Sequence, residues 1–509
     1  MDNYKIHPLL NQFKKGIESH PDRIAVIDKN ENNVTYADLS KKISNCREIL
    51  KKKGVQKGSR VLVAIPMSIE LYVILLALLS LGGIAVFLDP WLKGKQMSRI
   101  IKSVNPDLLL ISSKLRWLAY LMPACWKIKN WWTVKTIKGS DQQWSTTEVD
   151  ENDIALITFT GGTGGNPKGA DRSFGFLSAQ LKALHPHLKG NCAYKDFTNF
   201  PIVGLADLAI GNTVVVPNVN LMKIHKAKTA KIAKTLFQTK ANRLIVSPSL
   251  LNKCIDSIIE YRTSYYLRHV ITGGAPISYT LIERCLNQFP SLNFEAIFGS
   301  TEAEPMAFTN FEVMLKKMRD PLKGAYVGEI VKEVELKIIE PRRGPVCKKI
   351  FKTSSRNGAV GELIVSGEHV NKNYFENEKA FIENKIVDKN NKIWHRTGDI
   401  GYFSNGGLYL VGRLSRVMKH RSKTLHPYPI EFHLCRKLGL NDVGYIQTNQ
   451  KQFVLVIGGK TTVSENEIRS ACREAGYPLD KVYFFSKNLP RDPRHRSKLD
   501  ARRLLHQVS

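Results

Sequence analysis

The chain has 509 residues, which is too long for one hydrophobic core and predicts two or more domains. Its 43% hydrophobic and 24% charged residues are ordinary for a globular protein. The 76 basic and 45 acidic residues give a net charge of +31, which favours anionic partners: nucleotides, acidic lipid head groups or nucleic acid. The chain has no zinc finger, RNP-like aromatic motif or basic region joined to heptads, so nucleic acid is not an expected partner.

Cysteine usage and the N-terminus predict a cytoplasmic protein. The cysteines are widely spaced and form no Cys-x-x-Cys pair, which is typical of reduced thiols and not of a disulfide framework or a zinc site. The first residues lack the apolar core of a signal peptide. The uncharged stretch from Leu71 to Leu88 reaches the lower limit of membrane-spanning length, but Gly82 and Gly83 divide it. It therefore predicts a buried helix followed by a buried strand.

The first half of the chain alternates helical and short apolar patterns. Helical spacing covers residues 36–50, and buried-strand patterns cover 60–65, 107–112, 243–247 and 269–272. Such alternation predicts an α/β fold with mostly parallel sheets covered by helices. From about Gly324 the chain becomes strand-rich, with strands predicted at 333–339, 361–365 and 407–412. The C-terminal part predicts a small α+β unit, with strands at 452–457 and 482–485 and a helix at 465–475.

The most informative segment runs from Ile157 to Gly169, directly after an apolar strand pattern. Between Phe159 and Gly169 it contains five glycines, two threonines and one lysine. Free backbone N–H groups, hydroxyls and a mobile cation suit a polyphosphate. The segment is not a Walker A loop, because no Gly-Lys-Ser/Thr follows the glycines. A flexible linker would also be rich in glycine, but Pro-Lys-Gly directly after a strand favours phosphate binding.

This loop resembles the phosphate-binding signature of the acyl-adenylating superfamily, which includes acyl-CoA synthetases, peptide-synthetase adenylation domains and luciferases. That signature reads roughly Thr-Ser-Gly-Ser/Thr-Thr-Gly-x-Pro-Lys-Gly. Gly161 and Gly164 stand where the family usually has Ser and Thr, so two hydroxyls are missing. The resemblance implies that the loop binds the phosphates of ATP. The residues concerned are Thr160, Gly161, Gly162, Thr163, Gly164, Gly165 and Lys168.

Three further motifs resemble the same superfamily in the same order. The first is similar to its adenine-side loop and consists of Gly273, Gly274, Ala275 and Pro276 after Thr272. The second matches Tyr-Gly-x-Thr-Glu and consists of Phe298, Gly299, Ser300, Thr301 and Glu302. The resemblance implies that Thr301 contacts phosphate and Glu302 holds Mg²⁺, a hard cation that prefers oxygen ligands. The third consists of Asp399 in Thr-Gly-Asp and Arg413 in Gly-Arg. The resemblance implies that these two side chains bind the ribose hydroxyls.

The C-terminal segment resembles the family's mobile lid. The resemblance implies an adenylate-forming domain at residues 1–412, made of layered α/β subdomains with a small barrel-like β portion, and a lid domain at 413–509. Lys498 is the candidate for the lysine that stabilises charge on the carboxylate and the α-phosphate, although a surface lysine is the alternative. Arg416 replaces the family's hinge Asp, and Ser422 replaces the Gly that lets pantetheine pass.

Segments 200–217, 301–305 and 492–498 are more similar to the olefin-pathway β-lactone synthetases, a branch of this superfamily. This similarity implies ATP- and Mg²⁺-dependent activation of a long-chain 3-hydroxy fatty acid to an acyl-adenylate, whose own hydroxyl then closes a β-lactone. A long-chain acyl-CoA ligase, with CoA as the acceptor, is the alternative. A second alternative is a degenerate member that binds nucleotide or acyl ligand without turnover, given the off-pattern loop and hinge residues.

A short apolar and basic segment contains Trp117, Trp126, Trp131 and Trp132. Packing of these side chains within a core or subdomain is the favoured interpretation. The alternative is an element at a lipid interface, since Trp together with Lys and Arg suits that boundary. Under this alternative, the net positive charge and the tryptophans together predict peripheral association with an anionic membrane.

Overall fold

A computed structural model of the chain describes residues 6–89, 91–160, 167–190, 192–263, 266–346, 353–354, 357–491 and 499–508. The chain folds into two compact units. Unit 1 contains residues 1–272, 301–304 and 368–381, and unit 2 contains residues 273–300, 305–367 and 382–509. The predicted boundary between a domain at 1–412 and a lid at 413–509 stays a prediction.

The first sheet of unit 1 has the strand order β6-β5-β3-β4-β7-β8. Neighbouring strands from β6 to β7 are parallel, and β8 runs antiparallel to β7. The bounds are β3 (Arg60–Ala64), β4 (Ile84–Leu88), β5 (Leu108–Ser112), β6 (Asn130–Val134), β7 (Ile154–Thr160) and β8 (Lys168–Ser173). The strands predicted at 60–65 and 107–112 are therefore confirmed.

The uncharged stretch forms α3 (Ile69–Ser80) and then β4, as predicted. Every residue of α3 except Glu70 is buried, and a helix that is apolar on all sides belongs in a core. The hydroxyl of Ser68 caps its start by accepting a hydrogen bond from the Leu71 N–H at 3.3 Å. Gly82, with φ of 67°, turns the chain towards β4 in a left-handed conformation that favours glycine. In the described ranges, no helix is long and apolar enough to cross a membrane.

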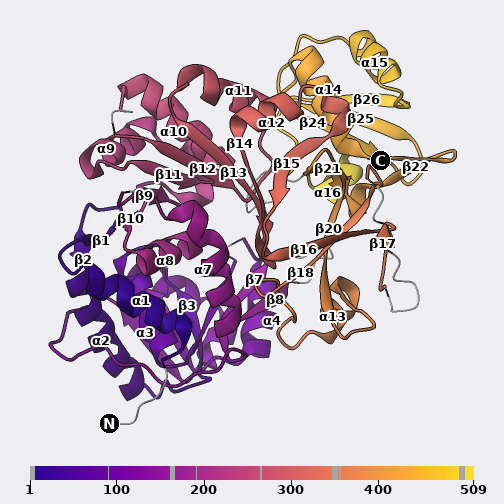
Figure 1. The fold of residues 1–509 in the computed structure, drawn as a ribbon. Coiled ribbons are helices and arrows are strands. Elements are labelled where there is room, and N and C mark those ends of the chain that lie inside the picture. Colours follow the sequence, from indigo (N-terminus) through magenta and orange to yellow (C-terminus); the bar gives the residue numbers. More distant parts are fainter. Residues whose placement is uncertain are drawn as a thin grey trace. The chain divides into compact units, whose positions relative to one another are not determined.

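The second sheet of unit 1 has the order β12-β11-β9-β10-β1-β2. Its strands are parallel except for β2. The bounds are β1 (Ile24–Ile27), β2 (Asn33–Thr35), β9 (Lys195–Thr198), β10 (Thr213–Val215), β11 (Arg243–Val246) and β12 (His269–Gly273). The helices of unit 1 also include α1 (Pro8–Ser19), α2 (Tyr36–Lys52), α4 (Gly94–Val104), α5 (Arg116–Tyr120), α6 (Pro123–Trp126), α7 (Phe174–Leu188), α8 (Pro201–Ile210), α9 (Thr229–Thr239) and α10 (Pro248–Tyr261). Helix α10 packs beside β11 (Figure 1).

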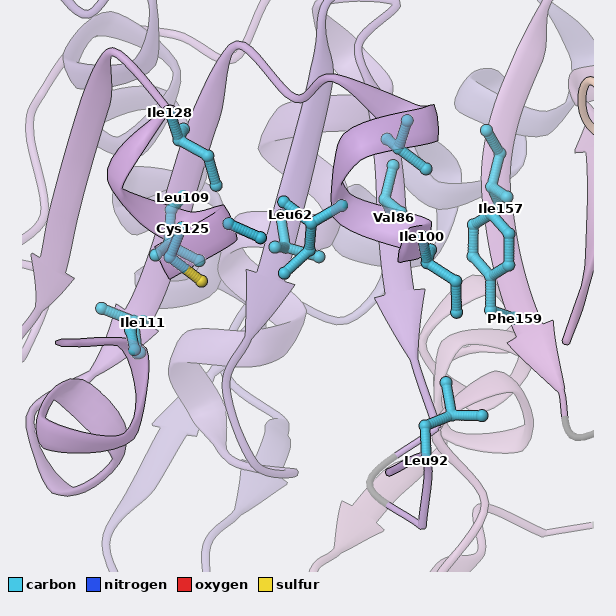
Figure 2. Packing of buried hydrophobic residues seen from close by; sticks show 14 of the residues in the cluster. Leu62, Val86, Leu92, Ile100, Leu109, Ile111, Cys125, Ile128, Ile157 and Phe159 are labelled. Atoms are coloured by element: carbon cyan, nitrogen blue, oxygen red, sulfur yellow. The ribbon is translucent and has the colours of Figure 1, made fainter. Parts of the chain in front are cut away.

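One hydrophobic core of unit 1 lies on the first sheet. Leu62, Val86 and Ile157 come from neighbouring strands, and Ile100 of α4 and Cys125 of α6 cover them (Figure 2). All five side chains are at most 5% exposed. Burial of such apolar strands on a sheet face is the main favourable term that holds this layer together.

The apolar segment 200–217 forms α8 and β10 and lies in the core of unit 1. One of its residues, Asp207 of α8, lies 3.7 Å from the guanidinium of Arg243, which donates to both carboxylate oxygens of Asp196 at 2.6 and 2.7 Å. None of these three side chains is exposed. Burial raises the pKa of Asp207 well above its ordinary value, and the nearby charge of Asp196 raises it further. The predicted substrate-side role of this segment stays a prediction.

The main sheet of unit 2 is antiparallel, with the order β17-β16-β18-β20-β21-β15 and β19 paired with β20. The bounds are β15 (Ala325–Ile330), β16 (Val334–Ile339), β17 (Thr353–Ser354), β18 (Gly361–Gly367), β19 (Lys385–Val387), β20 (Ile393–Ser404) and β21 (Gly407–Arg413). This sheet confirms the strand-rich pattern predicted from about Gly324. Unit 2 also contains β13 (Asn293–Ser300), most of β14 (Ala303–Asn310), α11 (Tyr279–Gln288) and α12 (Phe311–Lys317), and α13 (Glu378–Asn384) has residues in both units.

The C-terminal part of unit 2 is a small α+β arrangement, as predicted. Its sheet has the order β24-β25-β26, with β24 (Val443–Gln447), β25 (Phe453–Gly458) and β26 (Lys481–Phe485). The helices are α14 (Pro427–Leu438), α15 (Glu465–Glu474) and α16 (Ala501–Val508). A capping box between Ser464 and Glu467 starts α15. Separate hydrophobic clusters pack against the sheet, one with Ile430 and Ile468 and one with Leu504.

The tryptophan segment differs from the favoured prediction. Trp117 is 60% exposed and Trp126 is 64% exposed, while Trp131 and Trp132 are partly buried. Core packing is therefore the wrong interpretation for Trp117 and Trp126. Smaller neighbours, including Ala119 and Cys125, take the buried positions of the two short helices α5 and α6.

Candidate functional site

The glycine-rich segment connects two adjacent strands of one sheet. β7 ends at Thr160, β8 begins at Lys168, and these two residues are partners in the antiparallel register. A linker would connect separate bodies, so the linker interpretation is excluded. Gly169 is needed for close packing, because a Cβ there would lie 2.7 Å from the Phe159 ring. The predicted phosphate-binding residues Gly161, Gly162, Thr163, Gly164 and Gly165 lie outside the described residues.

Unit 1 holds the backbone of Thr301 and Glu302 from two sides. The Arg172 guanidinium, in β8, donates to the carbonyl oxygen of Thr301 at 2.7 Å. The Asn371 N–H donates to the carbonyl oxygen of Glu302 at 2.7 Å. Ala303 forms an antiparallel bridge with Val370 directly after these residues. The segment that carries the predicted phosphate and metal ligands is therefore fixed relative to β8.

Tyr374 connects Glu302 with Lys168. Its side chain is buried, and its hydroxyl donates to Glu302 Oε1 at 3.3 Å. Lys168 Nζ lies 5.8 Å from the centre of the Tyr374 ring, within the range of a cation–π contact. Burial raises the pKa of Tyr374, and the negative charge of Glu302 raises it further. The phenol therefore stays protonated and can orient the Glu302 carboxylate as a donor.

The segment with Tyr374 is in turn bound to β8. Asn371 Nδ2 donates to the carbonyl oxygen of Asp171 at 2.6 Å and to its carboxylate at 3.1 Å. The Phe375 N–H donates to the carbonyl oxygen of Gly169 at 2.9 Å. These contacts join β8, the Thr301–Glu302 segment and Tyr374 into one cluster. We call it the Glu302 cluster, and its members are Lys168, Arg172, Thr301, Glu302, Asn371 and Tyr374.

Three members of the Glu302 cluster, Arg172, Asn371 and Tyr374, were not predicted from the sequence. Tyr374 is 72 residues from Glu302 along the chain, and no local periodicity links the two. The cluster offers an ammonium group, which suits a polyphosphate, and a carboxylate, which suits a divalent cation.

The predicted adenine-side loop lies in unit 2. A Cβ on Gly273 would lie 2.5 Å from the carbonyl oxygen of Ile297, so only glycine fits there. Gly274 has φ of 79°. Gly274 and Pro276 are exposed, and Ala275 is partly buried. The loop thus presents backbone and small side chains, which a flat base can approach closely.

The residues before Thr301 form the end of β13 in unit 2. Phe298 packs against an apolar cluster that includes Leu363 and Leu408, so the residue that replaces the family's Tyr keeps a packing role. Gly299 and Ser300 are half-buried. The Ser300 hydroxyl oxygen is itself buried and has no hydrogen-bond partner among the residues with described positions. An orphaned hydroxyl of this kind fits a ligand that supplies the partner.

Asp399 and Arg413 come together at one end of the β20–β21 pair. They are register partners, and Arg413 Nη1 donates to Asp399 Oδ1 at 2.6 Å. Gly398, with φ of 68°, leaves room for the guanidinium, because a Cβ there would lie 3.3 Å from Arg413 Nη2. Tyr428, which no sequence motif indicated, lies close enough for Asp399 to affect it. Burial, followed by the charge of Asp399, raises the pKa of Tyr428 to about 12.

The off-pattern Arg416 has a partner of its own within unit 2. It forms a buried ion pair with Glu431 of α14 and donates to the carbonyl oxygen of Tyr445 at 3.1 Å. Glu431 also accepts a hydrogen bond from the Tyr445 N–H at 2.8 Å. The second off-pattern residue, Ser422, is exposed in the turn between β22 (Met418–His420) and β23 (Lys423–Leu425). Lys498 lies outside the described residues, and its catalytic role stays a prediction.

The fold is the predicted one: parallel sheets with helices, an antiparallel β portion and a small C-terminal α+β part. A family model described as AMP-binding enzyme matches residues 13–375, so the chain belongs to the family of AMP-binding enzymes. This match confirms the resemblance to the acyl-adenylating superfamily and the prediction of an enzyme.

Individual relatives are distant but match over nearly the whole chain. The chain is 24% identical to "Peroxisomal OPC-8:0-CoA ligase 1" of Arabidopsis thaliana, covering 94% of this chain and 89% of the relative. It is also 24% identical to "Olefin beta-lactone synthetase" of Xanthomonas campestris pv. campestris, covering 92% and 90%. Among solved structures, O-succinylbenzoate coenzyme A synthetase from Bacillus subtilis, in complex with ATP and magnesium ion, has the same fold, with a TM-score of 0.76, 22% identity and coverage of 96% and 98%. Together with the family model, these relatives support an AMP-forming acyl ligase activity.

The residues of the Glu302 cluster fit a magnesium–nucleotide complex. Proteins usually bind Mg²⁺ through one or two carboxylates together with phosphate oxygens. Glu302 is half-buried and can supply such a carboxylate, and Lys168 can supply positive charge for the phosphates.

Proposed function

We propose that the protein activates a long-chain carboxylic acid with ATP, forming an acyl-adenylate and pyrophosphate. One observation carries the ATP-dependent step: Thr301 and Glu302 are held by Arg172 and Asn371, and Tyr374 connects Glu302 with Lys168. This is the arrangement expected of a phosphate and metal site next to a glycine-rich loop. The match to the AMP-binding family supports the same reaction class. The long acyl chain rests on the resemblance of segment 200–217.

The proposed reaction forms one bond and breaks one. A carboxylate oxygen of the acid attacks the α-phosphorus, and pyrophosphate leaves with the electrons of the broken P–O bond. Lys168 reduces the negative charge of the phosphates, and Glu302, oriented by Tyr374, would hold Mg²⁺, which neutralises charge that builds up on the phosphate oxygens. The adenine-side role of residues 273–276, the ribose role of Asp399 and Arg413 and the charge-stabilising role of Lys498 are proposals that rest on the resemblance.

We take the acceptor of the acyl group to be an internal hydroxyl. In this step the 3-hydroxyl oxygen of the substrate attacks the acyl carbon, AMP leaves, and the hydroxyl proton passes to a base, which gives a β-lactone. The similarity to an olefin β-lactone synthetase supports this acceptor, as do the residues Arg416 and Ser422 at the family's hinge and pantetheine positions. The alternative is transfer to CoA, which the similarity to a CoA ligase supports.

Pyrophosphate release tests the proposal directly. Purified protein, Mg²⁺ and ATP would be combined with long-chain fatty acids or their 3-hydroxy analogues, each with and without CoA, and the products identified by mass. We expect turnover that requires the 3-hydroxyl but not CoA, with a β-lactone as the product.

The other outcomes separate the alternatives. Turnover that requires CoA and yields a thioester would show an acyl-CoA ligase and would overturn the lactone step. Binding of ATP without pyrophosphate release under any condition would overturn the proposed activity and identify a binding protein without turnover.

A further inference from the structure

The two short helices α5 and α6 of unit 1 expose large apolar side chains in an unusually dense group. Its members are Trp117 (60% exposed), Leu118 (40%), Tyr120 (50%), Leu121 (69%) and Trp126 (64%). Single exposed apolar residues are common on protein surfaces, but a contiguous group marks an interaction site. We call these five residues, together with the basic hollow described below, the aromatic–basic surface.

The exposure of these side chains is built into the local fold. Ala119, Ala124, Cys125 and Ile128 of the same segment are at most 5% exposed and pack into the core on the first sheet of unit 1. Cys125 and Ile128 lie within this packing in Figure 2. The backbone of the segment is therefore anchored, and its large aromatic residues occupy the positions that point away from the core.

Polar contacts fix the aromatic rings. Trp126 Nε1 donates to the carbonyl oxygen of Tyr120 at 3.0 Å, and Arg116 donates to the Tyr120 hydroxyl at 2.8 Å. The guanidinium of Arg116 also lies 5.5 Å from the centre of the Tyr120 ring. Rigid amphipathic rings next to cations are typical of residues at a membrane–water boundary.

A basic hollow of about 370 Å³ adjoins the apolar group. Its wall on α4 contains Lys95, Ser98, Arg99 and Lys102, and its other wall contains Leu121 and Met122. The three cations are exposed. The hollow therefore combines positive charge with an apolar side, as a phosphate head group and its adjoining acyl chain require.

The charge around this surface has one sign. Between Trp91 and Ser140 the chain contains ten Lys or Arg residues and a single acidic residue, Asp107. Basic residues near a membrane attract anionic lipid head groups, and exposed Trp and Leu can enter the interfacial layer. From this complementarity we infer that the aromatic–basic surface binds the surface of an anionic lipid bilayer. The inference is independent of which acceptor takes the acyl group.

Vesicle co-sedimentation of the full chain tests this inference. Vesicles of phosphatidylcholine alone would be compared with vesicles of equal parts phosphatidylcholine and phosphatidylglycerol, at low and high salt. We expect binding to the anionic vesicles to be about tenfold or more stronger than to the neutral vesicles, and to weaken at high salt. Equal binding to both, or no binding to either, would overturn the inference.

Matched triple variants locate the binding surface. Trp117→Ser, Leu121→Ser and Trp126→Ser together remove the centre of the apolar group. The control variant Met222→Ser, Phe237→Ser and Tyr261→Ser removes three other exposed apolar side chains of unit 1, which are 40%, 58% and 44% exposed. We expect about a tenfold loss of vesicle binding in the first variant and little change in the second. Equal losses would show that the surface is not specific and would overturn the inference.

Charge variants complete the test. Lys95→Gln, Arg99→Gln and Lys102→Gln would be compared with Lys226→Gln, Lys228→Gln and Lys231→Gln, which remove the same charge from exposed positions elsewhere in unit 1. We expect the first set to weaken binding to anionic vesicles more than the second. Unchanged thermal unfolding would show that each variant is folded. If the apolar variant kept its vesicle binding but changed the molecular mass in solution, the surface would instead join two copies of the chain.

Discussion

Two polar clusters of unit 1 hold their carboxylates in different ways. Asp196 and Asp207 have no exposed surface, and the Arg243 guanidinium supplies the charge that compensates Asp196. Glu302, in contrast, is half-buried, and the Tyr374 hydroxyl is one of the groups that donate to its carboxylate. An arginine–carboxylate pair with two short hydrogen bonds and no exposed surface is suited to holding strands together, whereas a half-buried carboxylate is accessible enough to meet a cation. The difference separates a structural cluster from a candidate site for chemistry.

The largest expected effect concerns the structural cluster. Arg243→Met would leave Asp196 buried without its counter-charge and would remove the contact with the Tyr194 ring, whose centre lies 3.8 Å from the guanidinium. Removing one partner of a buried ion pair typically costs ~3–5 kcal/mol. We expect a loss of this size in the free energy of unfolding, measured by urea titration. The exposed Arg268→Met is the control, with a change within ~0.5 kcal/mol; similar losses in both variants would contradict the structural role.

The Glu302 cluster should respond in activity and not in stability. Glu302→Gln keeps the shape and the acceptor for Tyr374 but removes the charge that would hold Mg²⁺. We expect pyrophosphate release to fall by about 100-fold or more, equivalent to ~2.7 kcal/mol, with an unchanged thermal unfolding temperature. The control is the exposed Glu368→Gln, which should retain activity. A stable Glu302→Gln variant with normal turnover would show that Glu302 is not the metal ligand.

The pH dependence of stability distinguishes the two kinds of carboxylate further. Because the folded-state pKa of Asp207 is raised, the folded chain keeps a proton that the unfolded chain loses above about pH 4. The stability that this proton contributes is complete below that pH and is lost as the pH rises towards the folded-state pKa. Asp207→Asn has no such proton to lose. As the pH rises from about 4 towards the folded-state pKa, we expect the wild-type protein to lose up to ~1.4 kcal/mol per pH unit relative to this variant.

Urea titrations at each pH provide the measurement for Asp207. The exposed Asp141→Asn serves as the control, and its stability should follow that of the wild-type protein at every pH. If the curves of Asp207→Asn and the wild-type protein were also parallel, Asp207 would be ionised in the folded state and the charge balance of the cluster would differ from the one inferred.

The sequence predicted the elements of both clusters but not the contacts that form them. Buried strands such as β3 and β11 are recognisable because they are short apolar runs between turn signals, and the family motifs identified Thr301 and Glu302. The partners were hidden, because Asp196 lies 47 residues from Arg243 and Tyr374 lies 72 residues from Glu302. Such pairs depend on strand register across the sheet, which local periodicity does not encode. The exposed Trp117 was missed for a related reason, since apolar character alone does not tell which face of a short helix is covered.

The smallest expected effect tests how the Glu302 carboxylate is oriented. Tyr374→Phe removes one hydroxyl that donates to Glu302 and keeps the ring beneath Lys168. A hydrogen bond to a charged group contributes ~1.5–3 kcal/mol. Because this bond is long, at 3.3 Å, we expect a loss near the lower end of that range, which corresponds to about a tenfold decrease in the rate of pyrophosphate release.

Tyr36→Phe is a matched control for this variant. It removes the hydroxyl of another buried tyrosine of unit 1, which donates to the carbonyl oxygen of Asn212 at 2.6 Å. It should lower stability without a comparable loss of activity, because it has no contact with the Glu302 cluster. A loss in Tyr374→Phe as large as that in Glu302→Gln would place the hydroxyl itself against the substrate. Full activity would show that the backbone contacts from Arg172 and Asn371 are sufficient to orient Glu302, and the comparison between the two clusters would then rest on burial alone.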